Sequence, residues 1–277
     1  MTKVNCRPKE VAGSILAEKE QGRALPTDVR VLLQGEPVEL EYFDSERDID
    51  GRFELCLGRP SIFVNLRGRT EDYPRVRFTL AHELGHYFLH RRLLREGRVF
   101  RDDRINLDQE AVLDQCEREA NEFAIEVLLP AVCVDRRLDQ VATIDIDFIN
   151  RLREDAHASF QATAIRVARR THDSICVLLV SSQGAVDWAV ASDSWRYSKL
   201  PVGMLVGKSI PSGSIGARKQ DDYKEETVPL KAWTANQPWR TLDLYESAIR
   251  TPFGRLILLG AGDEASGDDD DGREEDE

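Results

Sequence analysis

The segment from Val76 to Phe88 is strongly constrained to fold as a helix with one face against a core. Its apolar residues recur at four-residue spacing and form a single stripe of Val76, Leu80, Leu84 and Phe88. His82 and His86 stand beside this stripe, one turn apart on the same side of the helix. The sequence therefore predicts two imidazoles that can point at one cation at the edge of a core.

Glu83 follows the first histidine and completes the pattern H-E-x-x-H. On a helix, this glutamate turns toward the metal side, where it can act on a water molecule as a general base. Because the chain holds five histidines, the pattern arises by chance with odds on the order of one in a hundred. The alternative is a helix with two incidental histidines, one hydrogen-bonded in the core and one in solvent.

Catalytic zinc usually takes three protein ligands and keeps one position for water. His90 lies four residues beyond His86. On an unbroken helix it would stand about 12 Å along the axis from His82, at ~1.5 Å per residue. One ion cannot bond to all three rings at about 2.1 Å. We expect His90 either to support the site from behind or to be an ordinary packed histidine.

A second helical segment, Leu107 to Pro130, offers a better third ligand in Glu117. On a helical wheel this acid shares a stripe with mainly apolar and small residues, namely Leu113, Ala120, Asn121, Ala124 and Leu128. A carboxylate on a face built for close helix contact is costly without a partner. A metal ion is such a partner, and an arginine from another element is the alternative.

The strings RFTLAHELGHYFLH and EREANEFAIEVLLP resemble the ImmA/IrrE family of metallopeptidases, over roughly Pro26 to Pro130. The resemblance implies that His82 and His86 are the first two metal ligands and that Glu83 is the general base. It places the third ligand at Glu117, four residues before the Asn of an E-x-x-A-N pattern. This assignment agrees with the helical-wheel argument.

The segment before the histidines predicts a helix over Val4 to Gln21 and three short strands: Val38 to Phe43, Gly51 to Leu57 and Ser61 to Leu66. We expect these strands to form a small antiparallel sheet beside the histidine helix. In the zinc peptidases that the chain resembles, an edge strand aligns the extended substrate. Ser61 to Leu66 is our candidate for that edge, although it could equally serve only as core support.

We therefore expect an α+β protein in four parts: a zincin-like peptidase domain (1–130), a helical, helix-turn-helix-like segment (131–172), a β-rich or GAF-like domain (173–262) and a disordered acidic tail (263–277). The tail carries ten acids and one arginine, which is −9 of the net charge of −12. Such low-complexity acidic segments do not bury enough apolar surface to fold.

The segment 131–172 predicts three helices: Val132 to Val141, Asp147 to Ala156 and Ser159 to Arg170. The last helix is basic, with Arg166, Arg169 and Arg170, and a helix-turn-helix unit presents such a helix to DNA. Several acids nearby (Asp145, Asp147, Glu154 and Asp155) oppose phosphate binding. Direct DNA binding is therefore the less favoured alternative.

In the C-terminal domain, two hairpins are expected. One joins the apolar run Ile175 to Ser181 to the alternating run Ala185 to Ala191, and the other joins Leu244 to Ile249 to Leu256 to Leu259. The intervening segment, Pro201 to Gln237, reads as loop.

The composition also indicates the cellular compartment of the protein. The chain has no apolar run of 18 residues and no signal-peptide pattern at its N-terminus, which indicates a cytoplasmic protein without membrane spans. Five scattered cysteines without C-x-x-C predict reduced thiols.

Together these features predict a zinc-dependent endopeptidase in which His82, His86 and Glu117 hold the metal and Glu83 is the catalytic base. Mn²⁺ or Fe²⁺ would also suit this donor set. The family resemblance implies an Xre-type helix-turn-helix repressor as the protein substrate, so that cleavage would relieve repression. The alternative function is a DNA-binding or antitoxin-like regulator whose zinc site is structural or inactive. Candidate oxyanion donors are Tyr73, Tyr87, His157 and His172.

Overall fold

The structure, a computed structural model, describes residues 7–47, 49–56, 58–95, 107–195, 205–218, 224–229, 233, 243–251 and 254–261. The chain divides into two units. Unit 1 comprises Met1–Thr143 with Phe148–Arg170, and unit 2 comprises Ile144–Asp147 with Thr171–Glu277. The expected acidic tail from Asp263 lies outside the described residues. Within them, no helix is both long and apolar enough to cross a membrane.

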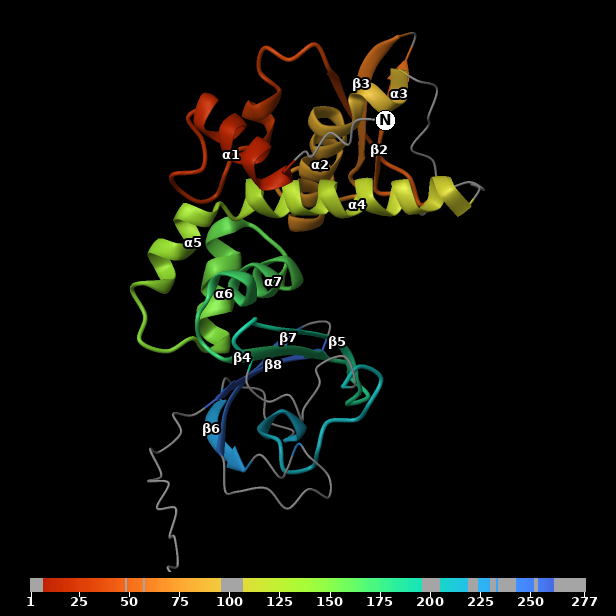
Figure 1. Cartoon of the computed structure of the whole chain (residues 1–277). Helices are drawn as coiled ribbons and strands as arrows, with labels where there is room; N and C mark the ends of the chain where they lie inside the picture. Colours follow the sequence, from red (N-terminus) through yellow and green to blue (C-terminus); the bar gives the residue numbers. More distant parts are fainter. Residues whose placement is uncertain are drawn as a thin grey trace, which may run out of the picture. The chain divides into compact units, whose positions relative to one another are not determined.

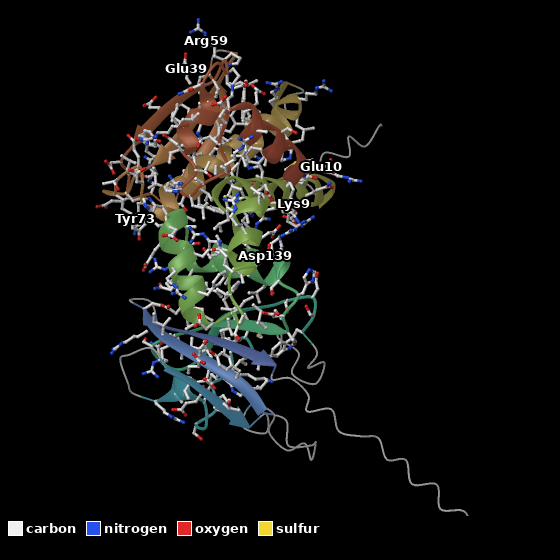
Figure 2. The ribbon with its side chains drawn as sticks, turned by 90° about the vertical axis from the view of Figure 1, so that its left-hand side faces the viewer. Lys9, Glu10, Glu39, Arg59, Tyr73 and Asp139 are labelled. Atoms are coloured by element: carbon white, nitrogen blue, oxygen red, sulfur yellow. The ribbon has the colours of Figure 1, made fainter. Side chains whose placement is uncertain are left out.

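Unit 1 contains a three-stranded sheet of β1 (Glu39–Phe43), β2 (Gly51–Cys56) and β3 (Arg59–Asn65). The order is β1-β3-β2, with β2 antiparallel and β1 parallel to β3. Glu39 lies opposite Ser61 in the parallel pair, and its carboxylate is 3.5 Å from the guanidinium of Arg59 (Figure 2). The strands fall where the sequence predicted them, but the sheet is mixed and not antiparallel.

The end of β3 is fixed against the segment that joins β1 to β2 by Asn65. The Asn65 amide donates to the carbonyl groups of Ser45 and Ile49 and accepts from the backbone N–H of Ser45. Because β3 is central, Ser61 to Asn65 cannot be an edge, and that expectation was wrong. The edges of the sheet are β1 and β2.

The helices of unit 1 that carry the site are α2 (Pro74–Gly85), its π-helical continuation η2 (His86–His90) and α4 (Leu107–Leu128). α2 packs on β2 and β3 on one side and on α4 on the other (Figure 1). The remaining elements are α1 (Pro8–Glu18), which also packs on α4, η1 (Val29–Leu33) and α3 (Arg91–Arg95). The core contains the fully buried side chains of Leu32, Ile62, Leu84, Tyr87, Phe123 and Leu128.

Three more helices follow, close to their expected positions: α5 (Ala131–Leu138), α6 (Ile146–Ala156) and α7 (Phe160–Arg170). The three arginines of α7 each face an acid of α4 or α5. Arg166 is buried and forms an ion pair of 2.5 Å with Glu126. Arg170 pairs with Asp135 at 2.5 Å, and Arg169 lies 4.0 Å from Glu122.

Unit 2 is built on an antiparallel sheet in the order β5-β4-β8-β7-β6. The strands are β4 (Ile175–Val180), β5 (Val186–Ala191), β6 (Lys224–Pro229), β7 (Asp243–Thr251) and β8 (Gly254–Ala261), with a short helix η4 (Ile215–Ala217). Both expected hairpins are present, whereas β6 lies in the segment read as loop. Glu246 on β7 is fully buried and accepts hydrogen bonds from Ser214, the Gly216 N–H and the Trp233 indole.

Candidate metal centre

The histidine helix forms as the apolar spacing predicts. Pro74 occupies its first turn, where a missing N–H costs nothing. Val76, Leu80 and Leu84 are buried, and the ring of Phe88 stacks on that of Phe123 at 5.9 Å between centroids. This packing fixes the rotation of the helix, so that His82 is partly covered and His86 is only 3% exposed.

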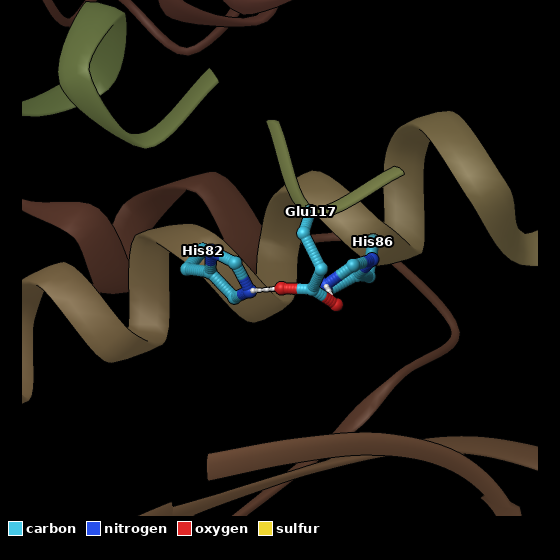
Figure 3. A group of neighbouring side chains, drawn as sticks. All are labelled: His82, His86 and Glu117. Carbon is cyan, nitrogen blue, oxygen red and sulfur yellow. Dashed lines mark hydrogen bonds and ion pairs between the residues drawn. The ribbon is translucent and has the colours of Figure 1, made fainter. Parts of the chain in front are cut away.

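Three side chains converge between α2 and α4, as Figure 3 shows. The carboxylate of Glu117 lies between the two imidazoles, with its oxygens 3.1 Å from His82 Nε2 and 3.2 Å from His86 Nε2. The two Nε2 atoms are 3.0 Å apart. These donor atoms all lie within 4.8 Å of one another, and they form the one such cluster found among the described residues.

The chemistry of the three donors suits a divalent metal ion. Burial works against charge on the Glu117 carboxylate, but hydrogen bonding to both histidines outweighs it and holds the pKa of Glu117 far below its usual range. Burial disfavours a charge on His86 and lowers its pKa. One anionic oxygen donor and imidazole nitrogens that offer lone pairs are the ligands of catalytic zinc sites with one carboxylate. The residues present therefore fit the metal that the motif implies.

His82 is oriented by α4 as well. Its Nδ1 lies 3.0 Å from Oδ1 of Asn121, an acceptor, so Nδ1 carries a proton and donates it in a hydrogen bond to that oxygen, while Nε2 faces Glu117. Burial opposes protonation of His82, but hydrogen bonding to Glu117 and the charge of Glu83 outweigh burial, so the pKa of His82 is raised. Asn121 was part of the predicted stripe on α4, although no role was assigned to it.

Glu83 lies on the same helix with its side chain buried, 7% exposed. Burial raises the pKa of Glu83 to about 7, the charge of Glu117 adds to that effect, and the charge of His82 opposes it. Its Oε1 lies against Gly51, the first residue of β2, where an added Cβ would approach it to 2.9 Å. A carboxyl group that titrates near neutral pH is suited to general-base work. Nothing in the sequence pattern identified Gly51.

The other polar candidates lie elsewhere. His90 is not in the cluster, because its ring contacts His86 and Glu119 instead. The hydroxyl of Tyr87 donates to Glu36 at 2.8 Å, which engages it away from the cluster. Tyr73, labelled in Figure 2, precedes α2, and the guanidinium of Arg69 lies over its ring. His157 and His172 are exposed beyond the ends of α6 and α7.

Unit 1 is thus a mixed α+β unit in which H-E-x-x-H on α2 and η2 faces an acid of α4. The comparison with protein families indicates a peptidase, because the model for the IrrE N-terminal-like domain, Peptidase_M78, matches residues 27–168. This match spans more than half of the 277 residues. The chain therefore belongs to this family, the ImmA/IrrE family that the sequence motifs indicated.

Among solved structures, a Mycobacterium tuberculosis transcriptional regulator matches with a TM-score of 0.58 and 14% sequence identity. That match covers 92% of this chain and 76% of the regulator, so it indicates a shared fold. No curated protein matches the sequence.

Proposed function

We propose that the protein is a zinc-dependent endopeptidase in which His82, His86 and Glu117 hold the metal and Glu83 is the general base. The convergence of the three donors from two helices, with the buried Glu83 on the same helix as both histidines, carries this proposal. Structural zinc sites usually have four protein ligands. A set of two imidazoles and one carboxylate leaves a position for water, as hydrolysis requires.

Zinc, when bound, would polarise the peptide carbonyl and acidify a water molecule to near-neutral pKa. Glu83 then accepts the proton of the attacking water and passes it to the nitrogen of the leaving amine. Burial raises the pKa of Glu83, which makes its carboxyl group a better proton acceptor than an exposed carboxylate. Gly51 leaves room for this carboxyl group, because a Cβ at that position would lie 2.4 Å from Cγ2 of Thr79 and 2.9 Å from Oε1 of Glu83.

We further propose that the edge strand β2 aligns the substrate. β2 pairs with β3 on one side, and the described strands provide no partner on its other side. Its first residue, Gly51, stands beside Glu83. An extended peptide that adds to this edge by backbone hydrogen bonds would pass close to the catalytic base.

The proposed substrate is a specific regulatory protein, an Xre-type repressor, whose cleavage would relieve repression. Family membership supports this choice. Direct DNA binding by α7 is less favoured, since Arg166 and Arg170 are engaged by Glu126 and Asp135. Phosphate contacts would have to compete with these ion pairs.

The test is incubation of the full chain, with zinc or with a chelator, with a candidate Xre-type repressor as the substrate. Wild type is expected to cut at a single site only with zinc. Glu83→Gln should retain the metal but not cleave, His82→Ala should lose both, and Glu122→Gln should behave as wild type. Cleavage by Glu83→Gln, from a preparation free of wild type, would refute the assignment of the base. DNA binding without any cleavage would favour the regulator alternative.

A further inference from the structure

Behind His86 lies a chain of side-chain contacts that the proposed reaction does not itself require. His86 Nδ1 is 3.1 Å from His90 Nδ1, and His90 Nε2 is 2.9 Å from Oε2 of Glu119. Gln115 donates to the other carboxylate oxygen of Glu119 at 2.8 Å. Both histidines are buried, 3% and 4% exposed, so these contacts are shielded from solvent.

With Glu119 ionised and both imidazoles neutral, the donors and acceptors in this series of contacts have one consistent direction. An ionised carboxylate only accepts, so Glu119 requires a proton on Nε2 of His90. In the neutral imidazole, Nδ1 of His90 is then an acceptor, and Nδ1 of His86 must be the donor. In the metal-bound protein His86 would consequently carry its proton on Nδ1, and the lone pair of its Nε2 would be free for the ion beside Glu117 and His82.

The geometry also explains why His90 is needed as a bridge. At about 100° per residue, two positions along a helix turn the side chain by roughly 200°, so Glu119 faces a different side of α4 from Glu117. Glu119 therefore reaches His86 through His90. The backbone from His86 to His90 forms a π-helical turn, a rare feature that is frequent at functional sites.

We propose that His90 and Glu119 are positioning residues that fix the tautomer and orientation of His86 for metal binding. This inference rests on the proposed metal site. α4 would then supply one metal ligand, Glu117, and an orienting group for each histidine: Asn121 directly for His82, and Glu119 through His90 for His86.

The test measures zinc affinity by chelator competition, and the visible absorption of the Co²⁺-loaded protein, on the full chain. His90→Leu removes the hydrogen bonds to His86 and to Glu119. Glu119→Gln removes the carboxylate at the far end of this series of contacts, at a partly exposed position. Each should weaken metal binding by roughly 10–100-fold and change the Co²⁺ spectrum. His90→Gln can accept from His86 and donate to Glu119, so it should restore most of the affinity. Glu122→Gln, on α4 like Glu119, should match wild type in zinc affinity and Co²⁺ spectrum.

The outcomes separate this inference from the proposed function. If wild type binds no stoichiometric metal, the metal site itself fails. If wild type binds metal and both His90→Leu and Glu119→Gln bind it equally well, the positioning role alone fails. If His90→Leu does not fold, Glu119→Gln decides. A purely structural role would lower the melting temperature of the metal-free protein without changing the affinity or the Co²⁺ spectrum of the folded variants.

Discussion

Gly85 of α2 lies directly against Ala120 of α4. A Cβ on Gly85 would come within 3.0 Å of the Ala120 Cα and 3.2 Å of its carbonyl oxygen. Ala120 and Ala124 are both fully buried. These small residues let the two helices approach closely, and that approach allows the short side chain of Glu117 to reach both imidazoles.

Gly85→Ala should therefore separate the two helices and weaken the metal site. The backbone of Ala120 cannot yield as a flexible side chain could, so we expect a loss of about 1–3 kcal/mol in the free energy of unfolding. The dissociation constant for zinc should rise in parallel. Urea unfolding of the metal-free protein and chelator competition measure the two effects.

A matched control is Gly13→Ala on α1, where no atom lies within 4 Å of the added methyl. This change should leave zinc binding unaltered and stabilise the protein by about 0.5–1 kcal/mol, since alanine suits a helix better than glycine. Equal behaviour of the two variants would show that the helix contact does not control the site.

Glu83→Gln should change how the stability of the metal-free protein depends on pH. The ordinary pKa of 4.5 applies to the unfolded chain, whereas burial raises the pKa of Glu83 to about 7 in the folded protein. Below pH 4.5 the carboxyl group is protonated in both states and costs nothing. Between pH 4.5 and about 7 the unfolded chain ionises while the folded protein keeps the proton on Glu83, so stability falls with pH. Above pH 7 the full cost of the buried charge remains, roughly 3 kcal/mol at about 1.4 kcal/mol per pKa unit.

Urea unfolding at pH 4.5 and pH 8 would reveal this difference. Relative to wild type, Glu83→Gln should be more stable at pH 8 and nearly unchanged at pH 4.5. Glu122→Gln serves as the control, because its carboxylate is partly exposed. If Glu83→Gln does not raise the free energy of unfolding above that of wild type at pH 8, the raised pKa of Glu83 is contradicted.

Arg166→Met should destabilise unit 1 strongly. Arg166 is 3% exposed, and besides Glu126 it donates to the carbonyl oxygen of Leu129 at 2.8 Å. Its loss leaves the Glu126 charge buried, at a cost of about 3–5 kcal/mol. The double variant Glu126→Gln/Arg166→Met should recover much of that stability. Arg170→Met, on the same helix in a half-exposed ion pair, should cost at most about 1 kcal/mol in urea unfolding.

Thiol labelling should distinguish the cysteines. Cys176 is fully buried, and burial raises its pKa to about 12, so at pH 8 it should react with a disulfide reagent only after unfolding. Cys56 is half-buried and should react in the folded protein. A Cys6→Ser background removes the one cysteine outside the described residues, and mass spectrometry locates the label. Equal labelling rates for Cys56 and Cys176 would contradict the packing of unit 2.

The convergence of His82, His86 and Glu117 could be predicted because each step depends on local helical geometry. The i, i+4 spacing places the histidines on one face, and the small residues on α4 indicate which acid approaches them. The burial of Glu126 could not be predicted in this way. In the sequence, Glu126 shares a polar side of the helix with Glu119 and Glu122. Its partner, Arg166, lies forty residues further along the chain, in another helix.

The strand order of the three-stranded sheet could not be predicted from the sequence either. Parallel pairing of β1 with β3 is accompanied by hydrogen bonds of Asn65 to the segment that joins β1 to β2, which alternating hydrophobicity does not encode. The π-helical turn from His86 to His90 has no known sequence signature either, so the same reasoning treated the helix as continuous.

The ion pair between Glu126 and Arg166 also limits how far the protein can be shortened. Glu126 caps the start of α5 through the Ala131 N–H, while its other oxygen faces Arg166. A truncation after Pro130 would leave the buried carboxylate of Glu126 without its partner, near the end of α4, the helix that carries Glu117. The smallest fragment that retains an intact α4 should thus extend through α7, to Arg170.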